Sequence, residues 1–490
     1  MKPTDIRNPD TFHKVVDCQW ACPAHTPVPE YIRLIAAGRY ADAYMVNWQS
    51  NVFPGILGRT CDRPCEPACR RGRVEENNGP ESMREKPEPV AICRLKRVAA
   101  DHKGDVKARM PKPATRLNGK RIACIGAGPA SLTVARDLAP LGYHVTIFEA
   151  DPKAGGFMRT QVPRFRLPEA VIDEECGYIL DLGVEFISGR RIESMKSMLG
   201  EGYDAVFVGS GAPRGRNLEI PGREEAAANI HLGLDWLANV YFEHVKSVGK
   251  RVIVLGGGNT AMDCCRSARR LGGVDVKVLV RSGFDEMKAS PWEKEDAMEE
   301  GIPILDYRVP KTFVHEDGKL TGMTFEIVRA EYDATLGEGK GRRKLVPTGE
   351  ADEFHACDEV LIAIGQENAF PWIERDCGIE FGEWDMPVVD KVTHQSSLPH
   401  VLFGGDAAFG PKNIIWAVAH GHAAAISIDK LLHAEDTRER PDPLVQLTSQ
   451  KMGIHEWTYD NDVSPDERFL VPWSKEAKKL DSIKVEVELG

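Results

Sequence analysis

The chain has 490 residues, of which 42% are hydrophobic and 28% are charged, and its formal net charge is −11. That length is too great for one hydrophobic core and predicts about three domains of roughly 100–200 residues each. The acidic balance argues against nucleic acid or an anionic membrane as the main partner, because binding either needs a positive field. No window approaches the roughly 20 apolar residues of a membrane span, so we expect a cytoplasmic protein without one.

Half of the 12 cysteines lie within the first 93 residues. They are spaced C-x3-C and later C-x3-C-x3-C, with prolines between them: Cys18, Cys22, Cys61, Cys65, Cys69 and Cys93. In a cytoplasmic chain, clustered cysteines indicate metal ligands before disulfides. Proline-punctuated loops that direct several thiolates to one point are typical of an iron–sulfur cluster, but four thiolates also suit a tetrahedral zinc ion. The spacing alone leaves iron–sulfur, zinc and buried core thiols open.

The sequence around these cysteines predicts a small basic domain. Residues 31–50 have apolar residues at intervals of three and four, which predicts a helix, and the proline-punctuated residues 101–118 predict a linker. The first 115 residues carry a net charge of +5, so the remainder carries −16. Five arginines lie near the cysteine triplet: Arg59, Arg63, Arg70, Arg71 and Arg73. They are either a solvated surface or a functional group of charges, which would compensate an anionic cluster or bind an acidic redox partner.

A dinucleotide-binding βαβ unit begins at Lys120. An apolar strand leads to the turn GAGPAS, a helix, and a second strand that ends in Glu149. The turn residues that we expect around a pyrophosphate are Gly126, Gly128, Pro129, Ala130 and Ser131, with Ser131 at the small position that permits close helix-to-strand contact. The pyrophosphate is expected at the helix N-terminus, where free N–H groups favour an anion, and Glu149 is expected to accept the ribose hydroxyls.

A second unit of the same kind begins at Arg251. Its turn GGGNTA predicts a second dinucleotide contact through Gly256, Gly258, Asn259, Thr260 and Ala261. Here the second strand ends at Arg281, which favours a 2′-phosphate and therefore NADP(H), with Lys288 nearby. The acidic residues Asp285 and Glu286 weaken that positive field, so NAD(H) remains the alternative.

Two fingerprints with different strand-end residues predict two different dinucleotides. A bound flavin and a diffusing nicotinamide are the simplest pair, since a hydride passes directly between them when their rings stack. The alternative is that one glycine turn is only a tight connection. The remaining six cysteines, among them the adjacent Cys264 and Cys265, are expected to be buried and inert.

The order of C-x3-C-x3-C, GAGPAS, GGGNTAMD and the late segment GGDAAFGPKNIIWAVAHGHAAA resembles the small (beta) subunit of bacterial glutamate synthase and the N-terminal half of dihydropyrimidine dehydrogenase. The resemblance implies an α/β protein in which an N-terminal α-helical iron–sulfur domain precedes two interleaved Rossmann-like domains of the disulfide-reductase type. It implies FAD, a [4Fe–4S] cluster and NADP(H) or NAD(H). The expected segments are a cluster domain at 1–115, FAD-binding parts at 116–235 and 371–435, an NAD(P) domain at 236–370 and an extension at 436–490.

The resemblance also assigns individual residues. It implies one cluster held by Cys22, Cys61, Cys65 and Cys69. Around FAD it adds Gly155, Gly156, Gly405, Asp406, Asn413, Ile414 and Ile415, the last three at the start of a helix whose dipole would stabilise a reduced flavin. No catalytic acid or base is identified, and hydride transfer between stacked rings needs none.

Two departures from the family pattern bear on this assignment. Nothing before Cys18 is a cysteine, so the two earliest thiolates of a second family cluster are missing. A second site that uses Cys18, Cys93 and other ligands stays open beside the alternative that both are spare buried thiols. The chain also continues past Leu432 into a charged tail with aromatic residues and an alternating, strand-like stretch at 483–489 that we expect to pack on the core or on another subunit.

These features predict an electron-transfer flavoprotein subunit. It would pass a hydride between NAD(P)H and FAD, and single electrons between FAD and the cluster, for a catalytic or electron-accepting partner subunit. The alternatives are a glutamate synthase small subunit proper and a self-contained reductase of a small acceptor. A scaffold that keeps the fold without its flavin is the non-catalytic alternative.

Overall fold

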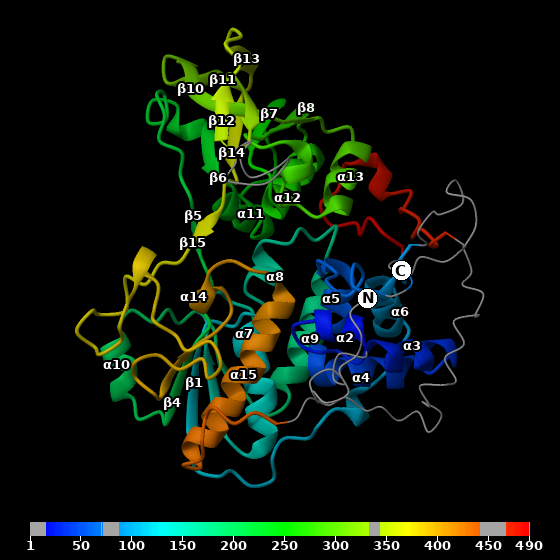
Figure 1. The fold of residues 1–490 in the computed structure, drawn as a ribbon, viewed down its shortest axis with the longest axis vertical. Coiled ribbons are helices and arrows are strands. Elements are labelled where there is room, and N and C mark those ends of the chain that lie inside the picture. The colour runs from blue at the N-terminus through cyan, green and yellow to red at the C-terminus, as the bar shows by residue number, and fades with distance from the viewer. Residues whose placement is uncertain (1–15, 70, 72–87, 333–343, 442–466, 490) are drawn as a thin grey trace.

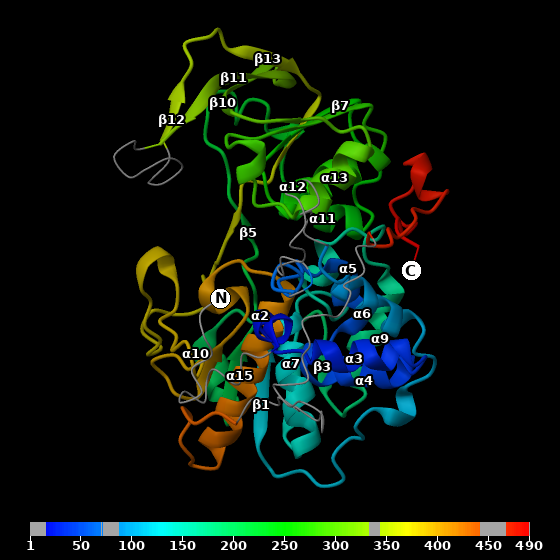
Figure 2. The same cartoon turned by 45° about the vertical axis from the view of Figure 1, so that its right-hand side comes forward.

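The computed structural model describes residues 16–69, 71, 88–332, 344–441 and 467–489. The first of these segments and residues 88–101 form a helical region that lies beside the lower of two α/β bodies (Figures 1 and 2). Its helices are α2 (Asp17–Ala21), α3 (Val28–Ala36), α4 (Tyr40–Asn51), α5 (Pro54–Thr60) and α6 (Ile92–Asp101). The helix predicted over residues 31–50 is therefore divided, because residues 37–39 make a turn between α3 and α4.

The lower body contains a five-stranded sheet in which every pair of strands is parallel. Its strand order is β16 (Val401–Phe403), β4 (Ala205–Val208), β1 (Arg121–Ile125), β2 (His144–Phe148) and β3 (Glu185–Ile187). Its helices are α7 (Pro129–Leu138), α8 (Phe157–Thr160), α9 (Glu169–Leu180), α10 (Met195–Gly200), α14 (Asp406–Phe409) and α15 (Ile414–Leu432). Strands such as β1 are apolar and almost wholly buried, as expected of a parallel sheet covered on both faces.

The upper body repeats this plan with a second parallel sheet. Its strand order is β6 (Ile230–Leu232), β14 (Glu359–Ile362), β7 (Arg251–Leu255), β8 (Asp275–Leu279) and β9 (Ile304–Leu305), with helices α11 (Gly233–Tyr241), α12 (Asn259–Arg270) and α13 (Pro291–Glu299). An antiparallel sheet lies beside it at the top of Figure 1 and consists of β10 (Arg308–Glu316), β11 (Lys319–Glu331), β12 (Lys344–Pro347) and β13 (Glu353–Ala356).

The chain passes between the two bodies through a short antiparallel ribbon. Strand β5 (Arg214–Gly215) leads upward and pairs with β15 (Gln366–Glu367), which leads back (Figure 1). The upper body is thus inserted within the sequence of the lower one, and β16, α14 and α15 complete the lower body after the return. The predicted α/β class with interleaved Rossmann-like units is confirmed, while the numbered domain boundaries stay predictions.

The helical N-terminal region shares a core with the lower body. One cluster of buried side chains includes Phe53, Leu57 and Cys61 together with Ile122 and Ile415. Burying these apolar groups together fixes the cysteine region against the first dinucleotide unit. Within the described residues, no helix combines the length and the apolar character needed to cross a membrane.

Glu175 of α9 links these two parts through polar contacts. Its carboxylate accepts hydrogen bonds from the backbone N–H groups of Gly55 at 2.7 Å and Ile56 at 2.9 Å, and from the Tyr44 hydroxyl at 2.9 Å. It therefore satisfies free N–H groups at the start of α5, the helix that leads into Cys61. Burial raises the pKa of Glu175 to about 7 against the lowering effect of these donors.

This raised pKa predicts a pH-dependent stability. Between the ordinary value of 4.5 and about 7, the folded chain keeps a proton on Glu175 that the unfolded chain has released. The free energy of unfolding should therefore fall as the pH rises through this window and become independent of Glu175 above it. We expect Glu175→Gln to lose this slope in urea unfolding measured across the window, whereas Glu174→Gln keeps it; equal slopes in all three proteins would contradict the prediction.

Candidate functional site

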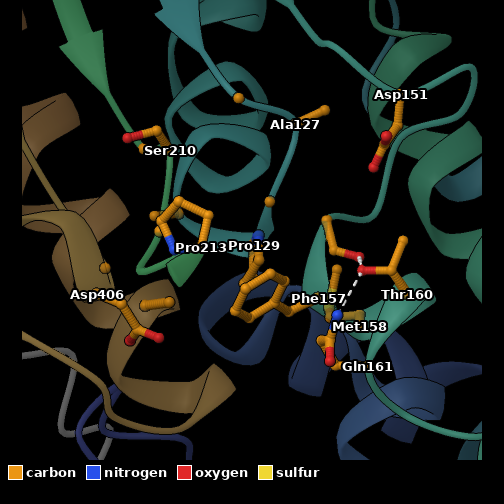
Figure 3. A pocket seen from close by; sticks show the side chains of 18 of the residues that line it. Ala127, Pro129, Asp151, Phe157, Met158, Thr160, Gln161, Ser210, Pro213 and Asp406 are labelled. Carbon is orange, nitrogen blue, oxygen red and sulfur yellow. Dashed lines mark hydrogen bonds between the residues drawn. The ribbon is translucent and has the colours of Figure 1, made fainter. Parts of the chain in front are cut away.

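A cavity of about 480 Å³ lies where the two dinucleotide units meet. In Figure 3, Ala127 and Pro129 of the first glycine turn lie on one side, Asp406 enters from α14, and Phe157, Thr160 and Gln161 come from around α8. Asn259, Thr260 and Asp263 of the upper body also line it. Both predicted turns thus contribute to one cavity, as direct transfer between two dinucleotides requires.

The first glycine turn has the backbone that its sequence predicts. Gly126 has φ +89°, and a Cβ there would lie 2.9 Å from the carbonyl oxygen of Gly209. Gly128 is the N-cap of α7, so the first N–H groups of this helix face the cavity. Ser131 does not line the cavity: it is fully buried, and a Cβ on Gly209 would fall 2.2 Å from its Oγ, so it serves the close helix-to-strand contact.

Glu149 lies at the cavity, directly after β2, as predicted. Its carboxylate accepts hydrogen bonds from the N–H groups of Ala127 at 2.6 Å and Asp151 at 3.0 Å. Burial raises its pKa despite these donors. The two donors orient the acid within the glycine turn, where a ribose hydroxyl is expected.

The late segment supplies the opposite wall. Gly405, Asp406, Asn413 and Ile414 of this segment line the cavity, and so does Gly156, the N-cap of α8. The side chain of Asp406 accepts a hydrogen bond from the Lys412 N–H at 2.9 Å, and burial raises its pKa to about 6.

Two of the residues predicted for the FAD site lie behind the cavity wall. Gly155 and Ile415 are not among the lining residues, and Ile415 is buried in the core. Asn413 caps α15 by accepting a hydrogen bond from the Trp416 N–H at 3.3 Å. The N-terminus of α15 therefore faces the cavity, although only its first residues reach it.

The second glycine turn repeats the geometry of the first. Gly256 has φ +136°, and a Cβ there would lie 2.2 Å from the carbonyl oxygen of Ala363. Gly258 is the N-cap of α12. Asn259 and Thr260 reach the cavity, whereas Ala261 is buried behind them. Arg281 and Lys288 are exposed beyond the end of β8 and do not line this cavity.

The cavity also contains side chains that fit a polar ligand. Ser210 Oγ and Gln161 Oε1 are buried in its wall and have no hydrogen-bond partner among the residues that the structure describes. Buried polar groups are normally paired, so unpaired ones that line a cavity fit a bound group with polar atoms of its own. The first glycine turn, Glu149 and these two side chains together fit FAD.

Sequence reasoning missed an ion network across the two bodies. Arg166, just before α9, pairs with Asp263 of α12 at 2.5 Å and with Glu293 of α13. Asp263 lines the cavity, so the network fixes the upper body at the site itself. Phe165 extends the contact, with the Arg270 guanidinium 3.9 Å from the centre of its ring. No pattern in the sequence marks Arg166, because a single charged residue carries no periodic signal.

The six N-terminal cysteines are all free thiols, and all except the half-buried Cys18 are buried. Within the described part of the chain, no three Cys, His, Asp or Glu side chains are arranged as a ready metal site. The thiols nevertheless influence one another: Cys65 interacts with Cys22 and Cys93, and a hydrogen bond from Cys61 lowers the pKa of Cys93 to about 6. Cys69 instead interacts with Cys18.

A buried cation faces these thiols. Lys96 is only 5% exposed, and its ammonium group lies near enough to four of them to interact electrostatically: Cys22, Cys61, Cys65 and Cys93. Burial lowers the pKa of Lys96, but the four thiols raise it, and the net shift is upward. A buried cation surrounded by thiols fits an anionic cluster, because an unpaired buried charge is costly. The same contacts favour Cys93 over Cys69 as the fourth ligand.

Lys96 gives a testable redox prediction. A positive charge about 10 Å away at an effective dielectric constant of about 20 contributes roughly 1.7 kcal/mol to the reduced state. For a one-electron couple this is about 70 mV. We therefore expect Lys96→Met to lower the midpoint potential of the cluster by about this amount in an EPR-monitored titration, and Lys107→Met, at an exposed position, to leave it unchanged. An unchanged potential in Lys96→Met would contradict this role.

Part of the predicted arginine cluster is neutralised within the chain by the tail. Arg59 pairs with Glu486 at 2.7 Å, Arg97 with Glu486 at 2.8 Å and Glu488 at 3.5 Å, and Arg94 with Glu488. Of these three arginines only Arg59 belongs to the predicted cluster, and its charge is compensated within the chain, by Glu486 of the tail. Arg94 and Arg97 of α6 were not part of that prediction. Of the predicted cluster, Arg70 and Arg73 lie outside the described residues.

The tail packs as predicted only in part. Trp473 and Val487 lie against Phe165, whereas Phe469 is 84% exposed. The strand predicted at 483–489 is wrong: in residues 467–489 the only β-pairing is an isolated bridge between Trp473 and Glu488. The backbone N–H of Ser474 donates to the Val487 carbonyl oxygen and that of Leu489 to the Pro472 carbonyl oxygen, while Glu486 and Glu488 form ion pairs with arginines. Trp457 and Tyr459 lie outside the described residues.

Two family models match successive parts of the chain. Residues 13–108 match dihydropyrimidine dehydrogenase domain II, 4Fe-4S cluster, and residues 120–421 match pyridine nucleotide-disulphide oxidoreductase. The join between them falls at the predicted linker.

Curated relatives extend over most of the chain. The beta subunit of NADP(+)-dependent formate dehydrogenase from Moorella thermoacetica is 36% identical, covering 90% of this chain and 63% of the relative. The beta subunit of an NADPH-Fe(3+) oxidoreductase from Geobacter sulfurreducens is 30% identical, covering 99% and 75%. The glutamate synthase [NADPH] small chain from Halomonas elongata is 32% identical, covering 84% and 87%. The chain thus spans less than two thirds of the Moorella relative.

Solved structures share the fold of the two bodies. FprA from Mycobacterium tuberculosis in complex with NADPH aligns with a TM-score of 0.52 at 19% identity, covering 66% of this chain and 87% of that one. Thioredoxin reductase from Lactococcus lactis aligns with a TM-score of 0.50 at 21% identity, covering 64% and 99%. At these identities the likeness concerns the fold alone.

Proposed function

Because the chain belongs to the pyridine nucleotide-disulphide oxidoreductase family and also carries a 4Fe-4S domain, we propose that it is the electron-transfer subunit of a larger oxidoreductase. The family makes it an NAD(P)H-dependent oxidoreductase that uses FAD and a [4Fe–4S] cluster. When bound, FAD exchanges a hydride with NAD(P)H and the cluster carries single electrons. The proposal adds that this chain passes those electrons to, or takes them from, a partner subunit.

The observation that carries the proposal is the shared cavity beside the cysteine loop. The turn at Gly126 and the N-terminus of α15 hold FAD, and Asn259 and Thr260 bring the nicotinamide dinucleotide to the same space. Arg166 keeps the two bodies in register through Asp263. No side chain is assigned a proton to move, because hydride transfer needs only aligned rings.

We propose that the residues predicted from sequence hold the cofactors, with two refinements. Cys22, Cys61 and Cys65 hold the cluster, and Cys93 takes the fourth position that the resemblance gave to Cys69. Gly155, Ser131 and Ala261 support the glycine turns from behind instead of touching a ligand. A second cluster at Cys18 and Cys69 would need two further ligands from elsewhere.

The names of the relatives support the proposal of a partner subunit. Two of them are named as beta subunits, one of a formate dehydrogenase and one of an iron(III) oxidoreductase. An electron-transfer subunit alone should oxidise NADPH only until its own centres are reduced, and should continue when an artificial acceptor is added. Anaerobic NADPH titration of the purified holoenzyme tests this: continuous rapid turnover of a small physiological acceptor by the isolated chain would instead favour a self-contained reductase.

A glutamate synthase small chain is the second candidate. The Halomonas relative supports it, since this chain covers 87% of that protein. Glutamate formation by a mixture of this chain with a glutamate synthase large chain, dependent on NADPH, would favour this candidate. Its failure, together with NADPH-dependent reduction of the cluster, would favour a partner of another kind.

A substitution of Arg281 tests whether the chain prefers NADP(H) or NAD(H). An arginine at this strand end can pair with the 2′-phosphate of NADP(H), which NAD(H) lacks. We expect Arg281→Ala to weaken NADPH binding about tenfold, equivalent to about 1.4 kcal/mol, and to leave NADH binding unchanged. Flavin bleaching at graded coenzyme concentrations measures both affinities, with Arg329→Ala, another exposed arginine of the upper body, as the control. An equal effect on both coenzymes would exclude this role.

A further inference from the structure

One hydrogen bond joins the cysteine loop directly to the helix that lines the cavity. The amide nitrogen of Asn413 donates to a carboxylate oxygen of Asp62 over 2.5 Å. Asp62 directly follows Cys61, and Asn413 is the N-cap of α15 and lines the cavity. The two residues are 351 positions apart in the sequence, so tertiary packing brings them together and local chain geometry does not.

In both side chains, each of the two polar atoms makes a contact. The second oxygen of Asp62 lies 3.9 Å from the Cys61 thiol, and the amide oxygen of Asn413 accepts the hydrogen bond from Trp416 that caps α15. A continuous path of contacts therefore leads from a thiol of the cysteine loop through Asp62 and Asn413 into the first turn of α15. Asp62 is half-buried, where a charge-assisted hydrogen bond is less exposed to competing water.

We propose that Asp62 is a positioning residue that clamps the Cys61 loop to the N-terminus of α15 and so sets the rate at which electrons pass between the FAD site and the cluster. This inference rests on the function proposed above and deepens it. Asp62 forms no covalent bond and exchanges no electron or proton in this role. It fixes the separation across which single electrons pass, and transfer rates fall steeply as that separation grows.

The alternative is that the contact only stabilises the fold. Glu175 is an example of such a contact: from α9 it accepts hydrogen bonds from backbone N–H groups of α5, and it does not line the cavity. A purely stabilising Asp62 would lower the free energy of unfolding without slowing electron passage selectively. The two roles are therefore separable by kinetics.

The test compares Asp62→Ala and Asp62→Asn with Asp42→Asn in the anaerobic holoenzyme. Asp42 is a carboxylate of the same region that pairs with Arg39 and Arg109 on the surface. Stopped-flow absorbance follows flavin reduction by NADPH, and freeze-quench EPR follows reduction of the cluster. Iron and FAD contents and both midpoint potentials are measured in every variant.

We expect Asp62→Ala to slow cluster reduction about tenfold, equivalent to a barrier higher by about 1.4 kcal/mol, because electron transfer slows steeply as the separation of the two centres grows. Flavin reduction and cofactor contents should not change. Asp62→Ala and Asp62→Asn both remove the negative charge beside Cys61, so both should raise the midpoint potential of the cluster to a similar degree. A higher potential favours reduction of the cluster, so slower reduction in Asp62→Ala reports the lost contact. Asp62→Asn, whose amide oxygen can still accept from Asn413, should lose less, and Asp42→Asn nothing. Cluster reduction at the wild-type rate in Asp62→Ala would overturn the clamp.

A charge swap keeps the test decisive if Asp62→Ala is unstable. Asn413→Asp alone places two carboxylates together and should slow cluster reduction, whereas Asp62→Asn with Asn413→Asp restores one donor and one acceptor. The double variant should reduce the cluster faster than Asn413→Asp alone, and no recovery would count against the clamp.

Hydrogen exchange separates failure of the clamp from failure of the proposed function. Amides of residues 61–69 should exchange faster in Asp62→Ala than in Asp42→Asn, and unchanged exchange would overturn the clamp. If the wild type bleaches its flavin but never reduces a cluster, the proposed electron path fails, and this exchange result alone then decides whether the clamp exists.

Discussion

A Cys61→Ser variant is expected to keep its FAD and lose its [4Fe–4S] cluster. Cys61 ends α5, is buried, and interacts with Cys93 and with the buried Lys96. A serine oxygen is a poor substitute for thiolate sulfur as an iron ligand, so cluster assembly should fail. Iron and acid-labile sulfide should be absent, while NADPH still bleaches the flavin.

The half-buried Cys377, which follows the return to the lower body, provides the matched control. Cys377→Ser should retain iron, sulfide and FAD at wild-type ratios. Full iron and sulfide contents in Cys61→Ser would contradict the assignment of Cys61 as a ligand. Zinc without acid-labile sulfide in the wild-type protein would show that these cysteines hold no iron–sulfur cluster. Cys93→Ser and Cys69→Ser then identify the fourth ligand, for which we expect the larger loss in Cys93→Ser.

A Gly126→Val variant is expected to show the reverse pattern, with its cluster intact and no FAD. Gly126 has φ +89°, and any Cβ there lies 2.9 Å from the Gly209 carbonyl oxygen. Non-glycine residues in such conformations carry strain on the order of 1–3 kcal/mol, and the valine methyl groups must also occupy space at the cavity wall. The flavin-to-protein ratio after denaturation measures the loss, and NADPH oxidation should disappear with it.

Gly104→Val is the control for backbone strain alone. Gly104 has φ +65°, but a Cβ at this position would have no neighbouring atom within 4 Å, so the variant shares the strain without the collision. This variant should bind FAD normally. Normal FAD content in Gly126→Val would show that the first glycine turn is not the flavin site.

Most of the fold could be predicted from the sequence because each dinucleotide unit is encoded locally. The strand, glycine turn and helix around Gly126 and around Gly256 have the predicted order, and these two glycines, the first of each turn, have positive φ angles. The resemblance to the glutamate synthase small-subunit family is confirmed, as are FAD, NAD(P) and a 4Fe-4S cluster as cofactors. The insertion of one unit in the other follows from the same order.

The parts that could not be predicted depend on contacts between distant segments. The Arg166 network, the Glu175 contacts and the Asp62–Asn413 hydrogen bond join residues separated by roughly 100 positions or more, and single charged residues carry no periodic signal. The tail was predicted as a strand from its alternation, but Glu486 and Glu488 alternate because they face arginines. An alternating pattern of apolar and acidic residues therefore cannot show by itself whether the segment pairs as a strand in a sheet or places its acidic side chains against a row of arginines.

The most direct test of the electron path is a single-turnover measurement on the wild-type holoenzyme. The protein is mixed anaerobically with one equivalent of NADPH, flavin absorbance is followed, and samples frozen at successive times are examined by EPR. We predict that the flavin bleaches first and that the reduced-cluster signal rises afterwards as part of the flavin absorbance returns. A flavin that bleaches with no cluster signal, or a cluster signal in Gly126→Val protein that lacks FAD, would contradict this path.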